Sequence, residues 1–340
     1  MSAPATYQRL LQIASQFGRR KIVVIGDLIA DEFLYGQISR VSREAPVLVL
    51  EYRDLIRVPG GAGNTANNLL DLGCRVSIAG MVGDDDAGTD LLRILAARGA
   101  DVRHVRKLRS YATPVKTRIL AGAHHSSRQQ VVRVDRGDYT RSAMSWTGSF
   151  AARVTRGAHA VILSDYQYGA VEPARVSAIT QAAARNRIPL VVDSRFRIKE
   201  FHGVTAITPN ITELEAAVGT VIGSDAGLLA RTARKVLRRQ RLGCLLVTQG
   251  RFGMTLFQPR KAPCRIPVFG TDQVADVTGA GDTVIAVFSL ALSCGASCED
   301  AALLANYAGG IVVMKRGTAT VTHAELVHAI RQDLCSGAKV

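Results

Sequence analysis

Short apolar runs alternate with amphipathic stretches along most of the chain. The apolar runs are predicted to be buried strands, and they lie at residues 21–26, 75–80, 159–164, 188–192, 204–208 and 243–248. Amphipathic stretches with helical spacing separate several of them, at residues 87–98, 172–186 and 224–241. Strands that are apolar throughout need cover on both faces, and crossover helices provide it. The pattern therefore predicts an α/β fold with a mostly parallel sheet flanked by helices on both faces.

Two regions depart from this alternation, residues 33–58 and 104–135. They contain strand-like runs, such as 47–50 and 116–120, without a long helix between strands. We expect them to form a small β-sheet lid inserted in a single domain that spans residues 1–340. The apolar face of such a sheet needs cover, from a closed active site or from a second copy of the chain. A homodimer through the lid sheet is therefore expected.

Polar side chains stand at the ends of several predicted strands. They are Asp27, Asp165, Asp193 and Asn210. In open α/β sheets, ligands bind in the crevice beyond the carboxyl ends of the parallel strands. Polar groups gathered at those ends are what such a crevice would present, so we expect the functional site at this edge of the sheet.

The chain of 340 residues carries 43 Lys and Arg against 28 Asp and Glu, a formal net charge of +15. This charge raises nucleic acid as a partner, because its phosphates attract cations. Much of the excess lies in the predicted helix 224–241, where the aromatic residues that would stack on bases are few. A solvated helix face explains that run better. We therefore expect no nucleic-acid partner, and a positive field that favours anionic small substrates.

The cysteines and the apolar segments of the chain indicate its cellular compartment. The six cysteines are dispersed without the paired spacing of a zinc site, so we expect them to be reduced. The N-terminus has no basic segment followed by an apolar core, and no run of about 18 apolar residues occurs in the sequence. These features predict a cytoplasmic protein with no membrane partner.

The segment 276–282, Asp-Val-Thr-Gly-Ala-Gly-Asp, precedes an apolar stretch that is compatible with a helix. The small residues Gly279, Ala280 and Gly281 let successive backbone N–H groups converge on an anion, and the helix start adds the positive end of its dipole. Asp282 would repel that anion, so its presence indicates a group that accepts a proton during phosphoryl transfer. The alternative is a glycine-rich turn in which Asp282 is only a favourable first-turn acid.

A second glycine-rich segment lies at residues 60–64 and opens another predicted helix. It begins a G-x-G-x-x-A pattern, the dinucleotide fingerprint, and acidic residues follow about twenty positions later. Against a nicotinamide enzyme, the residues before the glycines are polar rather than a buried strand. The favoured interpretation is a close approach of the backbone at Gly60 and Gly61 to a polyhydroxy ligand, with Asn64 supplying an amide that donates and accepts.

Two further segments carry weaker signals. Asn210 and Glu213 follow a predicted strand one helical turn apart, and their oxygens could hold magnesium through its water shell. Capping of the next helix by Thr212 explains the same polarity, so both interpretations stay open. The segment 248–253 is a glycine turn, by itself only a loop signal. The chain has no Walker sequence, which excludes a P-loop enzyme.

Taken together and in this order, residues 60–64, Asn210 with Glu213, the turn 248–253 and the segment 276–282 resemble the ribokinase-like (PfkB) sugar kinases. The resemblance extends over roughly residues 20–330. Within this family the narrower resemblance is to the kinases of D-glycero-β-D-manno-heptose 7-phosphate. The residues that carry the narrower match are 26, 27, 31, 39–46, 59–62, 208–210 and 276–285.

The resemblance implies an ATP- and Mg²⁺-dependent kinase that phosphorylates the anomeric hydroxyl of the heptose 7-phosphate. The product would be heptose 1,7-bisphosphate, a precursor of ADP-heptose and lipopolysaccharide. Asp282 would be the catalytic base, and the N–H groups of residues 279–282 would hold the transferred phosphoryl group. Asn210 and Glu213 would organise Mg²⁺ indirectly, through water. The nucleotide would be lined by Thr248, Gly250, Gly253 and Asn306, and the sugar by Asp27, Asp31, Gly60, Gly61 and Asn64.

A phosphate on the substrate calls for cations, above all arginine, whose planar fork matches phosphate oxygens. The candidates from the lid region are Lys107, Arg109, Arg118 and Arg133. Nothing in the sequence chooses among them.

The chain departs from the heptose kinase pattern in two places. A lysine of that pattern is absent after Asp165, where the chain reads Gln167-Tyr168, and another is absent after Asp193, where it reads Ser194-Arg195. No second nucleotide-binding module is seen, so the kinase step alone is expected. The alternatives are a kinase of another sugar or sugar phosphate, or a non-catalytic nucleotide- or sugar-binding protein of the same fold.

Overall fold

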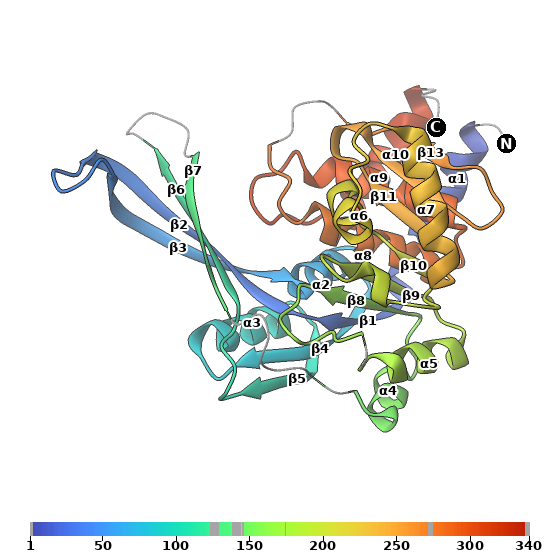
Figure 1. Ribbon diagram of the computed structural model, residues 1–340, viewed down its shortest axis with the longest axis horizontal. Coiled ribbons are helices and arrows are strands. Elements are labelled where there is room, and N and C mark those ends of the chain that lie inside the picture. The colour runs from blue at the N-terminus through green and yellow to red at the C-terminus, as the bar shows by residue number, and fades with distance from the viewer. Residues whose placement is uncertain are drawn as a thin grey trace.

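Two sheets form the framework of the protein in the computed structural model, which describes residues 3–122, 129–137, 144, 146–173, 175–270 and 275–336 (Figure 1). In these residues the larger sheet has nine strands in the order β13-β12-β11-β10-β9-β8-β1-β4-β5. In chain order they are β1 (Lys21–Gly26), β4 (Arg75–Gly83), β5 (Asp101–Leu108), β8 (Ala160–Asp165), β9 (Leu190–Ser194), β10 (Ala206–Ile207), β11 (Cys244–Thr248), β12 (Met254–Phe257) and β13 (Cys264–Ile266).

The strand order reverses at β1. From there the chain builds one side of the sheet with β4 and β5, and later the other side from β8 to β11, all in parallel pairs. β12 and β13 complete the edge as antiparallel strands. A reversal in a parallel sheet opens a crevice at the carboxyl end of the strands where the order changes. The topology thus fixes where a ligand can bind.

Helices cover both faces of this sheet because its strands are apolar on both sides. Ile22 and Val24 of β1 belong to one buried cluster, whereas Val23 and Ile25 belong to the other. The first face is covered by α1 (Ala3–Ala14), α2 (Ala62–Asp71), α3 (Asp86–Ala97), α8 (Ala280–Ser293), α9 (Cys298–Val312) and α10 (His323–Ser336). The second is covered by α4 (Gly148–Val154), α5 (Ser177–Asn186), α6 (Ile211–Val218) and α7 (Ala226–Gln240).

Short elements complete the described chain. The 3-10 helices are η1 (Phe17–Arg19), η2 (Ile198–Glu200) and η3 (Gly250–Phe252). None of the helices in the described residues has the length and apolar character needed to cross a bilayer.

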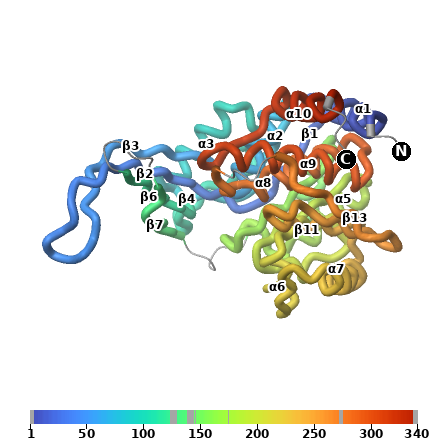
Figure 2. The backbone as a smooth tube through the Cα atoms, turned by 90° about the horizontal axis from the view of Figure 1, so that it is seen from above, coloured from blue at the N-terminus to red at the C-terminus, as the bar shows by residue number. Residues whose placement is uncertain are grey.

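The second sheet projects from the body as a long twisted ribbon (Figures 1 and 2). In the described residues it has four strands in the order β3-β2-β6-β7, which are β2 (Leu28–Val41), β3 (Leu48–Gly61), β6 (Val115–Gly122) and β7 (Gln129–Arg136). β2 begins two residues after β1 ends, so the chain leaves the main sheet directly. We call this sheet the lid.

The α/β fold, the flanking helices and the small second sheet are confirmed, with differences at the boundaries. Residues 104–108, expected in the lid, belong to β5 at the edge of the main sheet. Residues 123–128 of the expected lid segment lie outside the described residues. The helix expected over 172–186 begins only at Ser177, because the residues before it form turns.

The carboxylate of Asp27 ties β1 to the segment that follows β8. It accepts hydrogen bonds from the backbone N–H groups of Tyr166 at 2.8 Å, Tyr168 at 3.0 Å and Ala170 at 2.8 Å. Asp27 is 1% exposed, and burial raises the pKa of its carboxyl to about 6 although the three N–H groups oppose the shift. The side chain shapes the loop at the carboxyl end of β8.

We expect Asp27→Ala to lower the free energy of unfolding by about 3 kcal/mol or more. The substitution leaves three buried N–H groups without an acceptor, and each costs about 1–3 kcal/mol. Asp225→Ala is the matched control, since it removes an exposed helix cap of α7 that is worth about 1 kcal/mol. Urea denaturation measures both variants, and an equal loss in the two would contradict the role given to Asp27.

Candidate active site

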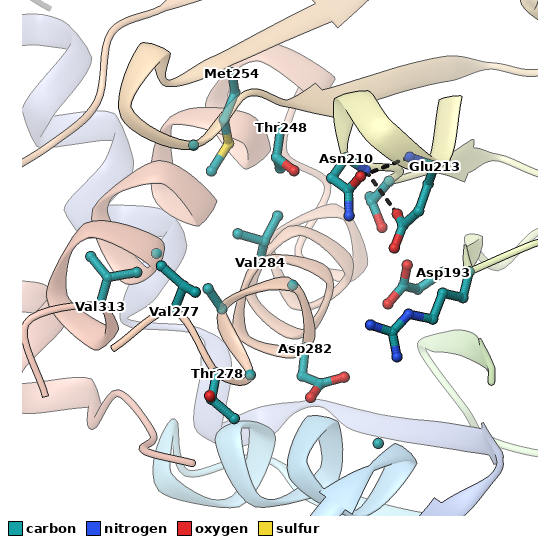
Figure 3. A pocket seen from close by; sticks show the side chains of 18 of the residues that line it. Asp193, Asn210, Glu213, Thr248, Met254, Val277, Thr278, Asp282, Val284 and Val313 are labelled. Carbon is teal, nitrogen blue, oxygen red and sulfur yellow. Dashed lines mark hydrogen bonds between the residues drawn. The ribbon is translucent and has the colours of Figure 1, made fainter. Parts of the chain in front are cut away.

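A cavity of about 560 Å³ lies at the carboxyl end of the main sheet, where its walls come from both sheets and from the start of α8 (Figure 3). Asp165, Asp193 and Asn210, three of the polar residues expected at strand ends, line it. Asp27 does not line it, because its carboxylate is turned to the backbone beyond β8. The structure therefore assigns Asp27 to the support of the site.

The start of α8 forms the floor of the cavity. Gly279 has a left-handed conformation with φ of 78°, and a side chain there would collide with the amide of Asn64. Gly279, Ala280, Gly281 and Asp282 all line the cavity. The N–H of Ala280 donates to the carbonyl of Val277 at 3.2 Å and is therefore already occupied. An anion at this helix start would instead be bound by the N–H groups of Gly281 and Asp282.

Asp282 is held by neutral donors from two other elements. Its carboxylate accepts hydrogen bonds from Asn64 Nδ2 of α2 and from the Tyr166 hydroxyl beyond β8, each at 2.9 Å. The residue is 4% exposed, and burial raises the pKa of its carboxyl to about 6, although both donors lower it. A carboxylate with a pKa near neutrality, facing a cavity, is suited to accept a proton.

A second group of acids lies on the opposite wall. Figure 3 shows the carboxylates of Asp193 and Glu213 pointing toward one another. Burial raises the pKa of the Asp193 carboxyl well above its ordinary value, and the charges of Glu213 and Asp282 add to the shift. The pKa of Glu213 is raised by burial as well. Crowded carboxylates of this kind are stabilised by a cation.

Asn210 and Glu213 also form a capping box at the start of α6. The N–H of Glu213 donates to Asn210 Oδ1 at 2.8 Å, and the N–H of Asn210 donates to Glu213 Oε2 at 2.9 Å. These residues therefore do cap a helix, as one of the two interpretations expected, but the cap is Asn210 rather than Thr212. Within the described residues no group of three His, Cys, Asp or Glu side chains could hold a metal directly. The acids present suit Mg²⁺, which keeps much of its water shell.

The residues expected on the nucleotide side are all brought to the cavity wall. Thr248, Gly250, Gly253 and Asn306 all line it. Asn306 Nδ2 donates to the carbonyl of Pro267 at 2.9 Å, so the backbone fixes its orientation. The wall here is completed by apolar side chains that suit the flat face of a base, namely Met254, Val268, Val284 and Val313.

The residues expected on the sugar side divide into lining and supporting positions. Asp31 and Gly61 line the cavity. Gly60 lies against the Asp31 carboxylate, where a side chain would collide with it. Asn64 is fully buried and does not line the cavity. Its side chain instead donates a hydrogen bond to Asp282, which does line it.

The four candidate phosphate-binding cations separate into two pairs. Arg118 and Arg133 line the cavity. Lys107 and Arg109 do not, because both lie beside Asp84 at the end of β5, with shortest distances of 2.9 and 3.7 Å. The structure therefore does not bring Lys107 and Arg109 to the cavity, and they lie at the end of an edge strand of the main sheet rather than on the lid.

Among the cavity residues that sequence reasoning did not assign to the site are Lys116 and Tyr166. Lys116 lies two positions before Arg118, and strand alternation places both on one face, so the signal was present. Of the two departures from the family pattern, Tyr168 is 2% exposed and lies outside the cavity, whereas Arg195 lines it. Arg195 thus supplies positive charge at the end of β9.

Comparison with known proteins agrees with this arrangement. The profile described as pfkB family carbohydrate kinase matches residues 19–325. The Bifunctional protein HldE of Geobacter metallireducens is 41% identical over 314 residues, which cover 90% of this chain and 62% of that protein. The Bifunctional protein HldE of Geobacter sulfurreducens is 40% identical over 322 residues, with 92% and 63% coverage. The chain therefore spans less than two thirds of the length of these relatives.

Solved structures show the same fold. The ribokinase of Arabidopsis thaliana, complexed with ribose and ATP, gives a TM-score of 0.72 at 19% identity and covers 92% of this chain and 98% of its own. Phosphofructokinase-2 of Escherichia coli, in complex with potassium, gives 0.71 at 17% identity, with 93% and 99% coverage. The fold is therefore ribokinase-like.

We expect Tyr166→Phe to move the acid limb of the pH profile of kcat/KM upward. In the parent protein this limb should lie near pH 6, because Asp282 must be ionised to accept a proton and its pKa is about 6. Loss of the hydroxyl donor raises that pKa further, by roughly 0.5–1 unit. Profiles of ATP-dependent sugar phosphorylation measure the shift, with the exposed Tyr52→Phe as control. An unmoved limb would contradict the role given to Tyr166.

Proposed function

The chain belongs to the pfkB family of carbohydrate kinases, and from this premise we propose that it phosphorylates the anomeric hydroxyl of D-glycero-D-manno-heptose 7-phosphate with ATP. The product is heptose 1,7-bisphosphate, a precursor of ADP-heptose and lipopolysaccharide. The observation that carries the proposal is the buried Asp282 carboxylate, which faces the cavity beside the amides that begin α8. A proton acceptor next to an anion site is what transfer to an alcohol needs.

In the proposed reaction, Asp282 removes the proton of the anomeric hydroxyl as its oxygen bonds to the γ-phosphorus of ATP. The bond from that phosphorus to the bridging oxygen breaks, and ADP leaves. The N–H groups of Gly281 and Asp282, together with the dipole of α8, stabilise the charge on the transferred group. Asn64 and Tyr166 keep the carboxylate oriented throughout.

The nucleotide is proposed to lie at the end lined by Thr248 and Asn306, with its phosphates directed toward α8. Asn210, Glu213 and Asp193 would hold Mg²⁺ through its water molecules. When bound, the ion neutralises phosphate charge. Burial raises the pKa of both Asp193 and Glu213, with repulsion from Glu213 adding to the shift of Asp193 and repulsion from Asp282 adding to that of Glu213, so both would become favourable as anions beside the ion.

The identity of the sugar rests on the residues that resemble the heptose 7-phosphate kinases, and the similarity to the HldE proteins supports it. Asp31 and the Gly60-Gly61 turn form the wall where the sugar hydroxyls are proposed to bind. We propose a cytoplasmic location, where ATP is supplied and where free thiols such as the six of this chain persist.

The outer face of the lid is proposed to bind a second copy of the chain. An apolar row crosses all four strands of this sheet, with Leu55, Leu34, Ile119 and Val132 as register partners. Because Ile119 follows Arg118, which lines the cavity, strand alternation places this row on the opposite face. Leu55 and Val132 are 39% and 46% exposed, and a row of this kind is stabilised by burial in an interface.

The test of the proposed function is product analysis with the purified chain, ATP, Mg²⁺ and heptose 7-phosphate. We expect a bisphosphate with the new phosphate on the anomeric oxygen, seen by phosphorus NMR. Asp282→Asn should keep nucleotide binding but lower kcat by about 10²–10⁴-fold, because the positioned base is lost. Phosphorylation of other sugars in preference, or undiminished turnover in the variant, would overturn the proposal.

We expect Val132→Glu to raise the dissociation constant of the homodimer at least about tenfold. A carboxylate in an apolar interface loses its hydration without gaining a partner. Analytical ultracentrifugation over a range of concentrations measures the effect. Val221→Glu, at a position that is 83% exposed before α7, is the control and should leave association unchanged. A parent chain that is monomeric at all concentrations would rule out this interface.

A further inference from the structure

The cavity face of the lid carries two rows of charged residues. β2 and β6 place Asp31 opposite Lys116, and β6 and β7 place Arg118 opposite Arg133. Side chains alternate along a strand, so Lys116 and Arg118 share one face, and both line the cavity. Asp135 of β7 is the other register partner of Lys116. Lys116 therefore stands between two carboxylates.

Each of those carboxylates is already paired with an arginine. Asp31 Oδ1 accepts a hydrogen bond from Arg118 at 2.7 Å. Asp135 is in an ion pair with Arg133 at 2.8 Å. The two sequence-predicted phosphate-binding arginines that line the cavity are thus compensated by acids of the lid itself.

Lys116 has no such compensation. It is 7% exposed, and in the part of the chain that the structure describes no carboxylate lies within 4.0 Å of its ammonium group. Burial lowers the pKa of this lysine, and repulsion from Arg195 adds to the shift, against the attraction of Asp31 and Asp135. A buried cation without a counter-ion is costly for the folded protein, and a bound anion removes that cost.

Arg195 approaches the same place from the main sheet. The Lys116 ammonium lies 5.0 Å from the centre of the Tyr166 ring, and the Arg195 guanidinium lies 5.9 Å from it. Both line the cavity, and Arg195 likewise has no ion pair among the described side chains. Two cations, one from the lid and one from the body, therefore meet over the residue that holds the catalytic base.

We propose that Lys116 and Arg195 bind a phosphate monoester that the sugar substrate itself carries, at a subsite distinct from the helix start that holds the transferred group. The inference rests on the proposed function and assigns the residues that recognise the second phosphate. A dianionic phosphate matches two cations that form no ion pair with the described side chains, although the Arg195 charge also acts on Asp193 and Glu213 from a greater distance. Lys116 lies beside Asp31 on the lid, the sugar side, whereas Thr248 and Asn306 mark the nucleotide side.

The subsite gives the enzyme a preference for a phosphorylated sugar over the same sugar without its phosphate. A free sugar leaves the two cations beside the Tyr166 ring with no substrate phosphate to bind. The preference is measured as the ratio of kcat/KM for heptose 7-phosphate to kcat/KM for free heptose. This ratio separates recognition of the substrate phosphate from any effect on the transfer step, which both sugars share.

The experiment compares the parent chain with Lys116→Met on these two substrates. We expect the variant to lose about 10- to 100-fold in kcat/KM for heptose 7-phosphate, mostly through KM, because a charge-assisted contact is lost. Its kcat/KM for free heptose should fall by a smaller factor, because that sugar carries no phosphate for Lys116 to bind. Arg195→Gln should act in the same direction, and Lys116→Arg should restore most of the preference. Lys235→Met, on the exposed face of α7, is the matched control and should match the parent.

Equal losses on both sugars would overturn the proposal, because they would place Lys116 on the transferred phosphoryl group. An unchanged ratio would overturn it too. The midpoint of thermal unfolding, measured without ligand, tests whether each variant is folded. We expect the midpoint of Lys116→Met to be equal to or above that of the parent, since an uncompensated buried charge is removed. If that variant does not fold, the ratio in Arg195→Gln decides by the same criteria.

Failure of the proposed function gives a different result. In that case the parent chain itself would not phosphorylate heptose 7-phosphate, or would phosphorylate the free heptose equally well. Failure of the subsite alone would leave the parent's preference intact while Lys116→Met and Arg195→Gln leave the ratio unchanged.

Discussion

The site depends on the burial of one carboxylate at the start of α8. Asp282 is removed from water by packing of α8 against α2 and the main sheet. Its hydrogen-bond partners among the described residues are uncharged, namely the Asn64 amide, the Tyr166 hydroxyl and, at 3.4 Å, the Thr65 hydroxyl. No arginine or lysine lies within ion-pair distance of it in the described residues. Such a partner would lower its pKa and weaken it as a base. Neutral donors orient the group and let burial keep its pKa near neutrality.

The alternation of side chains along the lid strands decides which charges face the cavity. Side chains on the cavity face and on the outer face alternate, so Arg118 enters the cavity while the next residue, Ile119, joins the apolar outer row. The outer face thereby carries the apolar row that we propose to pair with another copy, and the inner face carries the charges that line the cavity. A shift of one residue in register would turn the apolar row toward the cavity and the charged residues away from it.

The sequence predicts the fold well where a strand or helix carries a continuous pattern. The buried runs at β1, β4, β8 and β11 are recognisable because both faces of the main sheet are covered. Residues 104–108 of β5 were assigned to the lid because no long helix separates them from the strand-like runs that follow. Lys107 and Arg109 were assigned to the lid with them. Counting cations in a region does not show which face of which sheet they occupy.

Asp27 and Asp282 show why a shifted pKa alone does not identify a catalytic residue. Burial raises the pKa of both carboxyls to about 6, and both follow glycine in the sequence. Three backbone N–H groups occupy the Asp27 carboxylate, so it has no access to a ligand and instead fixes the loop that carries Tyr166. Asp282 faces the cavity and keeps acceptor capacity for a proton. The two acids are therefore linked, because Asp27 positions Tyr166, whose hydroxyl orients Asp282. Only the structure shows that one of these carboxylates supports the site and that the other faces the cavity.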